Sequence, residues 1–198
     1  MHRDEVEASL AATAYHEAGH AVCAYMLGRA FTRVSIRADD STLGRCSFRP
    51  PGEWFRPDLK VDGSTRRRLE ERIMISLAGP EAEARFTSHF DAESAQEDLD
   101  RAIDHACFMT GDEAEASAYI EWLRLRTLNL MKLPDFWPAV EALAGELRAR
   151  EEVRYGSAKR IIDRARGSAP PAERLAPAGW ATPHWPNATL ESVRRRRP

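Results

Sequence analysis

The chain has 198 residues, enough for one domain with a sizeable core and an additional tail. Its 29 basic and 31 acidic residues give a formal charge of -2, so no bulk electrostatic field favours binding to nucleic acid or to an acidic membrane. Three scattered cysteines and the lack of a long apolar run exclude a disulfide framework and a membrane span, and they predict a cytoplasmic protein.

The first predicted helix covers about residues 4–27 and ends before Gly28, a residue typical of helix C-termini. Because its second half is apolar nearly all round, we expect this helix to be buried. Gly19 weakens the helix by about 1 kcal/mol, which suggests a close neighbour there, either a metal or a substrate. From residue 11 to residue 27 the clearly polar side chains are Thr13, His16, Glu17 and His20.

Three of these polar residues form the motif His-Glu-x-x-His at residues 16–20. Residues four apart share one helix face, so His16 and His20 can bind a single metal ion while Glu17 projects beside it. Zinc peptidases use this arrangement, with two imidazoles on Zn²⁺ and the glutamate as general base for the attacking water. A buried group of this kind is costly unless a cation satisfies it. We therefore predict a zinc site rather than two ordinary core or surface histidines.

Two strands are predicted next, at residues 33–37 and 45–48, because apolar and polar residues alternate there. The polar loop between them favours a hairpin. Its edge near Val34, Ser35 and Ile36 is a candidate substrate-binding site, where an extended peptide would add as a further strand. The alternative is that this strand is simply core sheet. Residues 49–63, rich in proline and glycine, are expected to be irregular.

The remaining elements are predicted to be helical. Ser64 is expected to cap one helix, which Gly79-Pro80 breaks or kinks before residues 81–86 resume it. A capping box at Ser94 opens the next helix. Others are expected at about residues 112–131, at 136–147, and after a cap at Ser157.

A domain of residues 1–166 and a tail of residues 167–198 follow from the change in composition. The tail is rich in proline and ends in four arginines, so we expect it to be disordered. Such a basic run could contact nucleic acid or an acidic partner, but a solvated tail is the favoured interpretation.

Two histidines leave a catalytic zinc site incomplete, because such sites have three protein ligands and a water. Asp98 has the best local case, since the capping box places it in the first turn of its helix, where the helix dipole favours an ionised carboxylate. An ordinary first-turn acid remains the alternative. The full set of candidates is His89, Asp91, Glu93, Glu97, Asp98, Asp104 and His105.

Over most of its first 165 residues the chain resembles the peptidase domain of the FtsH-type ATP-dependent zinc metalloproteases. The segment 16–22 is similar to that family's zinc motif, residues 77–83 to its Leu-Ala-Gly-Arg-Ala-Ala-Glu-Glu segment, and residues 98–102 to its Asn-Asp-Leu-x-x-Ala-Thr motif. The resemblance implies that Asp98 is the third zinc ligand, and it adds Leu43 and Gly44 to the candidate substrate-binding residues. It also implies a mainly helical fold with a small hairpin beside the zinc helix.

These observations predict a zinc-dependent endopeptidase that cleaves unfolded or flexible polypeptides, with one Zn²⁺ and with Glu17 as general base. The sequence contains no Gly-x-x-x-x-Gly-Lys-Ser/Thr phosphate loop, so we expect no motor in this chain, and a separate unfoldase or adaptor would have to deliver folded substrates. The oligomeric state is left open. The alternatives are a zinc-stabilised regulatory or binding module without turnover and an enzyme that acts on a non-peptide amide.

Overall fold

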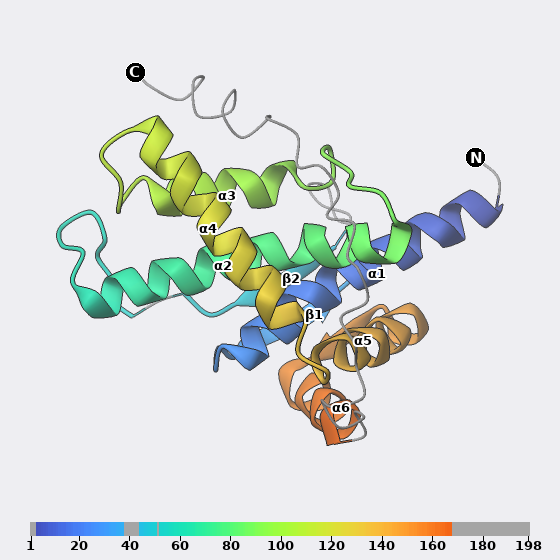
Figure 1. Ribbon diagram of the computed structural model, residues 1–198. Coiled ribbons are helices and arrows are strands. Elements are labelled where there is room, and N and C mark those ends of the chain that lie inside the picture. The colour runs from blue at the N-terminus through green and yellow to red at the C-terminus, as the bar shows by residue number, and fades with distance from the viewer. Residues whose placement is uncertain (1–2, 38–43, 51, 168–198) are drawn as a thin grey trace.

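The computed structural model describes residues 3–37, 44–50 and 52–167, which form a mainly helical fold with a small antiparallel sheet, as predicted. Figure 1 shows the arrangement of the helices and the sheet. The elements are α1 (Arg3–Met26), β1 (Phe31–Ser35), β2 (Arg45–Phe48), α2 (Gly63–Thr87), α3 (Gln96–Ala106), α4 (Glu113–Met131), α5 (Phe136–Arg150), β3 (Glu152–Arg154) and α6 (Tyr155–Gly167).

The long helices α1 and α2 form the centre of the fold. α1 packs against α2 on one side and α5 on the other, while α2 also contacts α3 and α4. In Figure 1, α3 lies on the opposite side of this pair from α5 and α6, while α4 crosses α2 and reaches towards α5. The buried face of α1 consists largely of small residues such as Ala14, Ala18 and Ala21. Small side chains let the two helix axes approach closely, which places residues of both helices in one site.

Gly19 marks the point of closest approach between α1 and α2. A Cβ atom on Gly19 would lie 2.5 Å from the carbonyl oxygen of Ala78 and 2.6 Å from the Cβ of Ala82. The predicted close neighbour of this glycine is therefore present, but it is not a metal or a substrate. Its close neighbour is the backbone of α2.

The sheet has the strand order β2-β1-β3, with both pairs antiparallel. Val34 pairs with Cys46 on one side and with Val153 on the other, and the backbone N–H of Ile36 donates to Glu151. The predicted peptide-binding edge at Val34, Ser35 and Ile36 is thus wrong, because β1 is hydrogen-bonded on both sides. β3 was not predicted, since three residues carry too little alternation to indicate a strand.

The structure also corrects three helix boundaries. α2 begins after Asp62, whose side chain accepts from the backbone of Ser64 and Thr65, and it runs unbroken through Pro80. A proline inside a helix costs about 3 kcal/mol, but residues 73–84 of α2 are all buried, and this packing offsets the cost. α3 begins after Ala95 without a side-chain cap, and α6 begins at Tyr155.

Some predictions fall outside the described residues. They include the tail beyond Gly167 and the hairpin loop with Leu43. Among the described helices, none has the length and apolar character needed to cross a membrane.

Candidate metal centre

Three side chains from two helices meet in the interior of the protein. His16 and His20 lie one turn apart on α1, and Asp98 lies in the first turn of α3. One ligand atom from each of the three residues lies within 4.8 Å of the other two. All three residues are buried. Of the seven residues considered as a third ligand, Asp98 is the one that the fold brings to the histidines.

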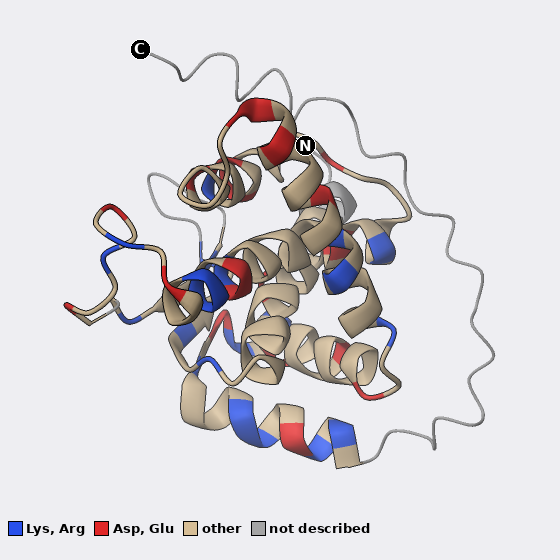
Figure 2. Ribbon diagram, turned by 60° about the vertical axis from the view of Figure 1, so that its left-hand side comes forward, with Lys and Arg blue, Asp and Glu red and all other residues tan. Residues whose placement is uncertain are grey.

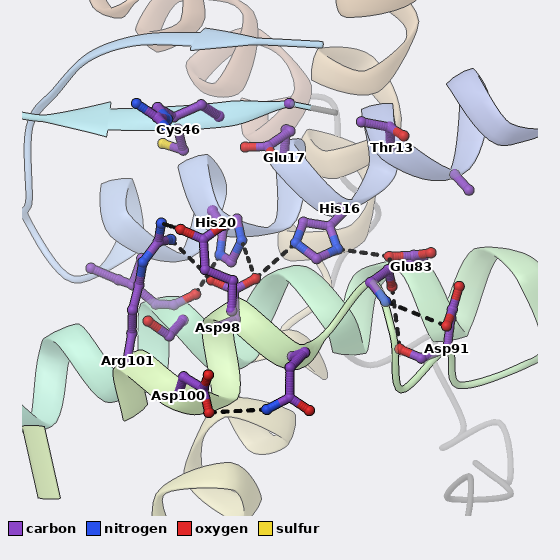
Figure 3. A pocket seen from close by; sticks show the side chains of 18 of the residues that line it. Thr13, His16, Glu17, His20, Cys46, Glu83, Asp91, Asp98, Asp100 and Arg101 are labelled. Atoms are coloured by element: carbon purple, nitrogen blue, oxygen red, sulfur yellow. Dashed lines mark hydrogen bonds and ion pairs between the residues drawn. The ribbon is translucent and has the colours of Figure 1, made fainter. Parts of the chain in front are cut away.

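Two of the distances between these ligand atoms are close to those of a tetrahedral zinc site. The Nε2 atoms of His16 and His20 lie 2.9 Å and 3.1 Å from the same Oδ2 atom of Asp98 (Figure 3). In a tetrahedral zinc site with bonds of about 2.0 Å, two ligand atoms are roughly 3.3 Å apart. The three atoms could therefore hold such an ion with only small side-chain adjustments.

The protonation of the two imidazoles also fits a cation. His20 Nδ1 lies 2.7 Å from the carbonyl oxygen of Ile75, which can only accept, so this nitrogen carries the proton. His16 Nδ1 lies 2.7 Å from Oε2 of Glu83. In the neutral form, each ring would present the lone pair of its Nε2 to the carboxylate of Asp98, which is also an acceptor. Three acceptors that converge in a buried space require a proton or a metal ion between them.

The pKa shifts of His16 and Asp98 also indicate that the centre favours a positive charge. Burial lowers the pKa of His16, but its hydrogen bonds to Asp98 and Glu83 outweigh burial and raise the pKa to about 10. Burial opposes ionisation of Asp98, yet the neighbouring His20 and His16 hold the pKa of this carboxyl well below its ordinary value. The centre thus attracts a positive charge strongly.

Glu17 lies beside the three residues and is not engaged by them. Its side chain is 5% exposed, and its Oε2 has no hydrogen-bond partner among the described residues. Burial raises the pKa of Glu17, which makes its carboxylate a better proton acceptor. A free, buried acceptor next to a metal site is the arrangement that a general base needs.

Two glycines leave room for these side chains. A Cβ atom on Gly79 of α2 would lie 2.8 Å from His16 Nε2 and closer still to His20 Nε2. A Cβ atom on Gly44 would lie 2.9 Å from Oε1 of Glu17. Gly44, predicted as a substrate-binding residue, therefore borders the general base directly.

The centre opens into a cavity of about 1490 Å³ whose walls come from α1, β2, α2 and α3. The residues of β2 line it, and Figure 3 shows Cys46 of this strand on the same side of the centre as Glu17. Burial keeps the pKa of the Cys46 thiol well above its ordinary value, and its sulfur is not among the ligand atoms that converge. The centre therefore has three candidate ligands and an open side.

The other candidates for the third ligand have different partners or positions. Glu97 pairs with Arg101, and Asp91 accepts from the backbone N–H of Glu93. His105 lies further along α3, and its pKa is lowered to about 4 by burial and then by Arg72.

The groups that orient the ligands were not predicted from the sequence. Glu83 accepts a hydrogen bond from His16 and another, of 3.0 Å, from the hydroxyl of Ser94. The hydroxyl predicted to cap α3 thus binds Glu83 instead. A signal was present, since Glu83 is an acid within the apolar helical segment that includes Leu77 and Ala84.

Comparisons with known proteins add nothing to this geometry. Neither the known protein families nor the curated proteins include a match to this sequence.

Proposed function

We propose that this protein is a zinc-dependent endopeptidase that acts on unfolded or flexible polypeptides. The observation that carries the proposal is the buried group of His16, His20 and Asp98, with the unpartnered carboxylate of Glu17 beside it. The pairing of a His-Glu-x-x-His helix with an aspartate from a later helix also supports kinship with FtsH-type peptidase domains.

The two imidazoles and the carboxylate would hold the metal, and this donor set suits zinc. A bound zinc ion would supply Lewis acidity, lowering the pKa of water and polarising the scissile carbonyl. Closed structural zinc sites have four protein ligands, whereas the described residues supply three here. This difference favours catalysis over a zinc-stabilised binding module without turnover.

Glu17 acts as the proton carrier. Its free Oε2 accepts a proton from the attacking water as the new C–O bond forms, and the protonated carboxyl then donates that proton to the leaving amine nitrogen as the C–N bond breaks. The raised pKa of Glu17 supports both steps. It makes the carboxylate a stronger base for the first proton transfer, and it keeps the pKa of the protonated carboxyl closer to neutral pH for the second.

β2 supplies the binding edge that was expected at β1. β2 pairs with β1 on one side and is an edge strand of the described sheet, and it lines the cavity beside the metal centre. An extended substrate would pair with this edge through main-chain hydrogen bonds, which do not depend on the side chains of the substrate. Such a binding mode requires an unfolded segment.

The test is a Glu17→Gln protein. We expect it to keep its zinc, measured by metal analysis of the purified chain, and to lose cleavage of casein, because glutamine cannot accept the proton. Glu53→Gln is the matched control, since Glu53 is exposed and does not line the cavity. Casein cleavage that survives unchanged in Glu17→Gln would contradict the mechanism.

A further inference from the structure

One end of the cavity carries an arginine cluster that the proposed reaction does not use. Arg68 and Arg72 lie four residues apart on α2 and therefore share one helix face, and Arg29 follows α1. All three line the same cavity as His16 and Glu17. Figure 2 shows bands of basic and acidic residues along the N-terminal turns of α2, the helix that carries Arg68 and Arg72. We call these three residues the arginine cluster.

The cluster has more positive charge than its neighbours neutralise. Arg29 forms an ion pair with Glu71. Arg68 and Arg72 form no ion pair within the described chain, and their Nε atoms are shielded from solvent without a hydrogen-bond partner there. Burial, together with the neighbouring guanidinium groups, holds the pKa of Arg72 below its ordinary value. Both side chains line the cavity, so a carboxylate that enters it would meet two guanidinium groups that no carboxylate of the described chain pairs with.

The geometry of Arg72 is partly set in advance. Its guanidinium lies over the ring of Phe55, 5.1 Å from the ring centroid. This contact limits the freedom of the side chain, so less entropy is lost when a ligand binds. A guanidinium fork matches a carboxylate, as the pair of Arg29 with Glu71 already illustrates.

The position of the cluster relates it to the scissile bond. Gly79 of α2 touches the ligand nitrogens, and Arg72 and Arg68 lie seven and eleven residues before it. At 1.5 Å per residue, these separations are about 10 Å and 16 Å along the helix. An extended peptide advances about 3.3 Å per residue, so the cluster would meet a group roughly three to five residues from the cleaved bond. The opposite end of the cavity is lined by acids such as Asp91 and Glu93, which would repel the same group.

We propose that Arg68 and Arg72, supported by Arg29, form a carboxylate-binding subsite of the cavity. It recognises a carboxylate of the polypeptide, from an acidic side chain or from the chain terminus, about three to five residues from the bond at the metal centre. This inference rests on the proposed function for its choice of a polypeptide ligand. It makes the arginine cluster a determinant of specificity.

The experiment measures binding without turnover. Zinc-loaded, full-length Glu17→Gln protein is titrated with fluorescein-labelled, unstructured peptides that differ in one internal residue, glutamate or glutamine, each with a free or an amidated C-terminus. Fluorescence anisotropy reports the affinity. We expect peptides with a carboxylate to bind about tenfold more tightly than the amidated glutamine peptide, the difference that one charged hydrogen bond supplies. The peptide pair that shows the difference identifies the source of the carboxylate.

Arg68→Gln/Arg72→Gln in the same background should remove this preference. Arg67→Gln, at an exposed neighbouring position that does not line the cavity, should keep it. Circular dichroism checks that each variant is folded. Should the double variant not fold, the comparison of the four peptides on Glu17→Gln alone decides.

Equal affinity for all four peptides, or no binding of any, would overturn the subsite. So would a preference that survives in the folded double variant. The outcome is independent of catalysis: a protein that prefers the carboxylate peptides yet never cleaves casein would refute the peptidase and leave the subsite standing.

Discussion

His16 is held by two carboxylates from two other helices. Asp98 faces its Nε2 and Glu83 faces its Nδ1, so the orientation and tautomer of the ring depend on residues far from it in the chain. His20 depends instead on a backbone carbonyl, that of Ile75. Side-chain substitutions can therefore remove the group that orients His16, but not the backbone carbonyl that orients His20.

Glu83→Gln should lower the affinity for zinc about 10- to 100-fold, the usual effect of losing a group that orients a metal-bound histidine. Competition with a chromophoric chelator measures the affinity. Ser94→Ala should have a smaller effect in the same direction, because Ser94 donates to Glu83 without touching the ring. If Glu83→Gln bound zinc as tightly as the unaltered protein, Glu83 would not orient His16.

His105 should make stability depend on pH. Its pKa is lowered to about 4, first by burial and then by Arg72, while Asp104 acts in the opposite direction. In the unfolded chain an imidazole titrates near pH 6.5, at about its ordinary value. Between these values the unfolded state binds more protons, so the free energy of unfolding falls as the pH drops from about 6.5 towards 4, and the full contribution is present above this window.

Replacing His105 by asparagine should remove this part of the dependence. Denaturant unfolding at pH 7 and at pH 5 should show a smaller loss of stability in His105→Asn than in the unaltered protein. Parallel losses in the two proteins would show that His105 titrates normally in the folded state.

At the scale of elements, the site depends on how closely α1 and α2 approach each other. Gly19 of α1 packs against Ala78 and Ala82 of α2. Gly79, the residue after Ala78, leaves space for the two imidazoles. The unbroken course of α2 through Pro80 places Gly79 and Glu83 on the same continuous helix. A larger side chain at the crossing would push apart the helices that carry the site.

Gly19→Ala should lower the free energy of unfolding by about 1–3 kcal/mol, because the added methyl group overlaps the backbone of α2. Gly145→Ala on α5 is the matched control, since no atom lies within 4 Å of its added Cβ. It should raise stability by up to about 1 kcal/mol through helix propensity. Denaturant unfolding of both variants measures the difference, and a neutral Gly19→Ala would mean that the helices separate at no cost.

For the whole molecule, a metal ion would join helices from distant parts of the chain. His16 and Asp98 are 82 residues apart. A ligand that binds only the folded state stabilises it by about 4 kcal/mol when its concentration is 1,000 times its dissociation constant. Binding of the metal should therefore raise the free energy of unfolding of the whole domain.

Removal of the metal with a chelator should lower the melting temperature of the protein, and addition of zinc should restore it. The effect should be absent in His20→Ala, which lacks a ligand, and present in His89→Ala, whose exposed histidine lines the cavity without joining the centre. Differential scanning fluorimetry gives the comparison. An equal chelator effect in His20→Ala would place the metal elsewhere.

Most helices could be predicted because their signals are local. Periodic apolar residues and N-terminal capping residues both lie within a few turns of the helix that they indicate. Asp112 is an example, because its side chain accepts from the backbone N–H of Glu115 at the start of α4. β3 and the continuity of α2 through Pro80 could not be read in this way. Three residues become a strand only beside β1, and a proline stays in a helix only where buried packing offsets its cost.

The sequence by itself determined one half of the centre. The spacing of His16 and His20 places them on one face of any helix, and Glu17 follows with them. The tertiary structure decided the rest: Asp98 among seven candidates, Glu83 behind His16, and the arginine cluster at one end of the cavity. The physical reason is distance along the chain. Residues 67 to 82 positions apart meet only when packing of small, apolar helix faces brings α1, α2 and α3 together, and no local spacing records that contact.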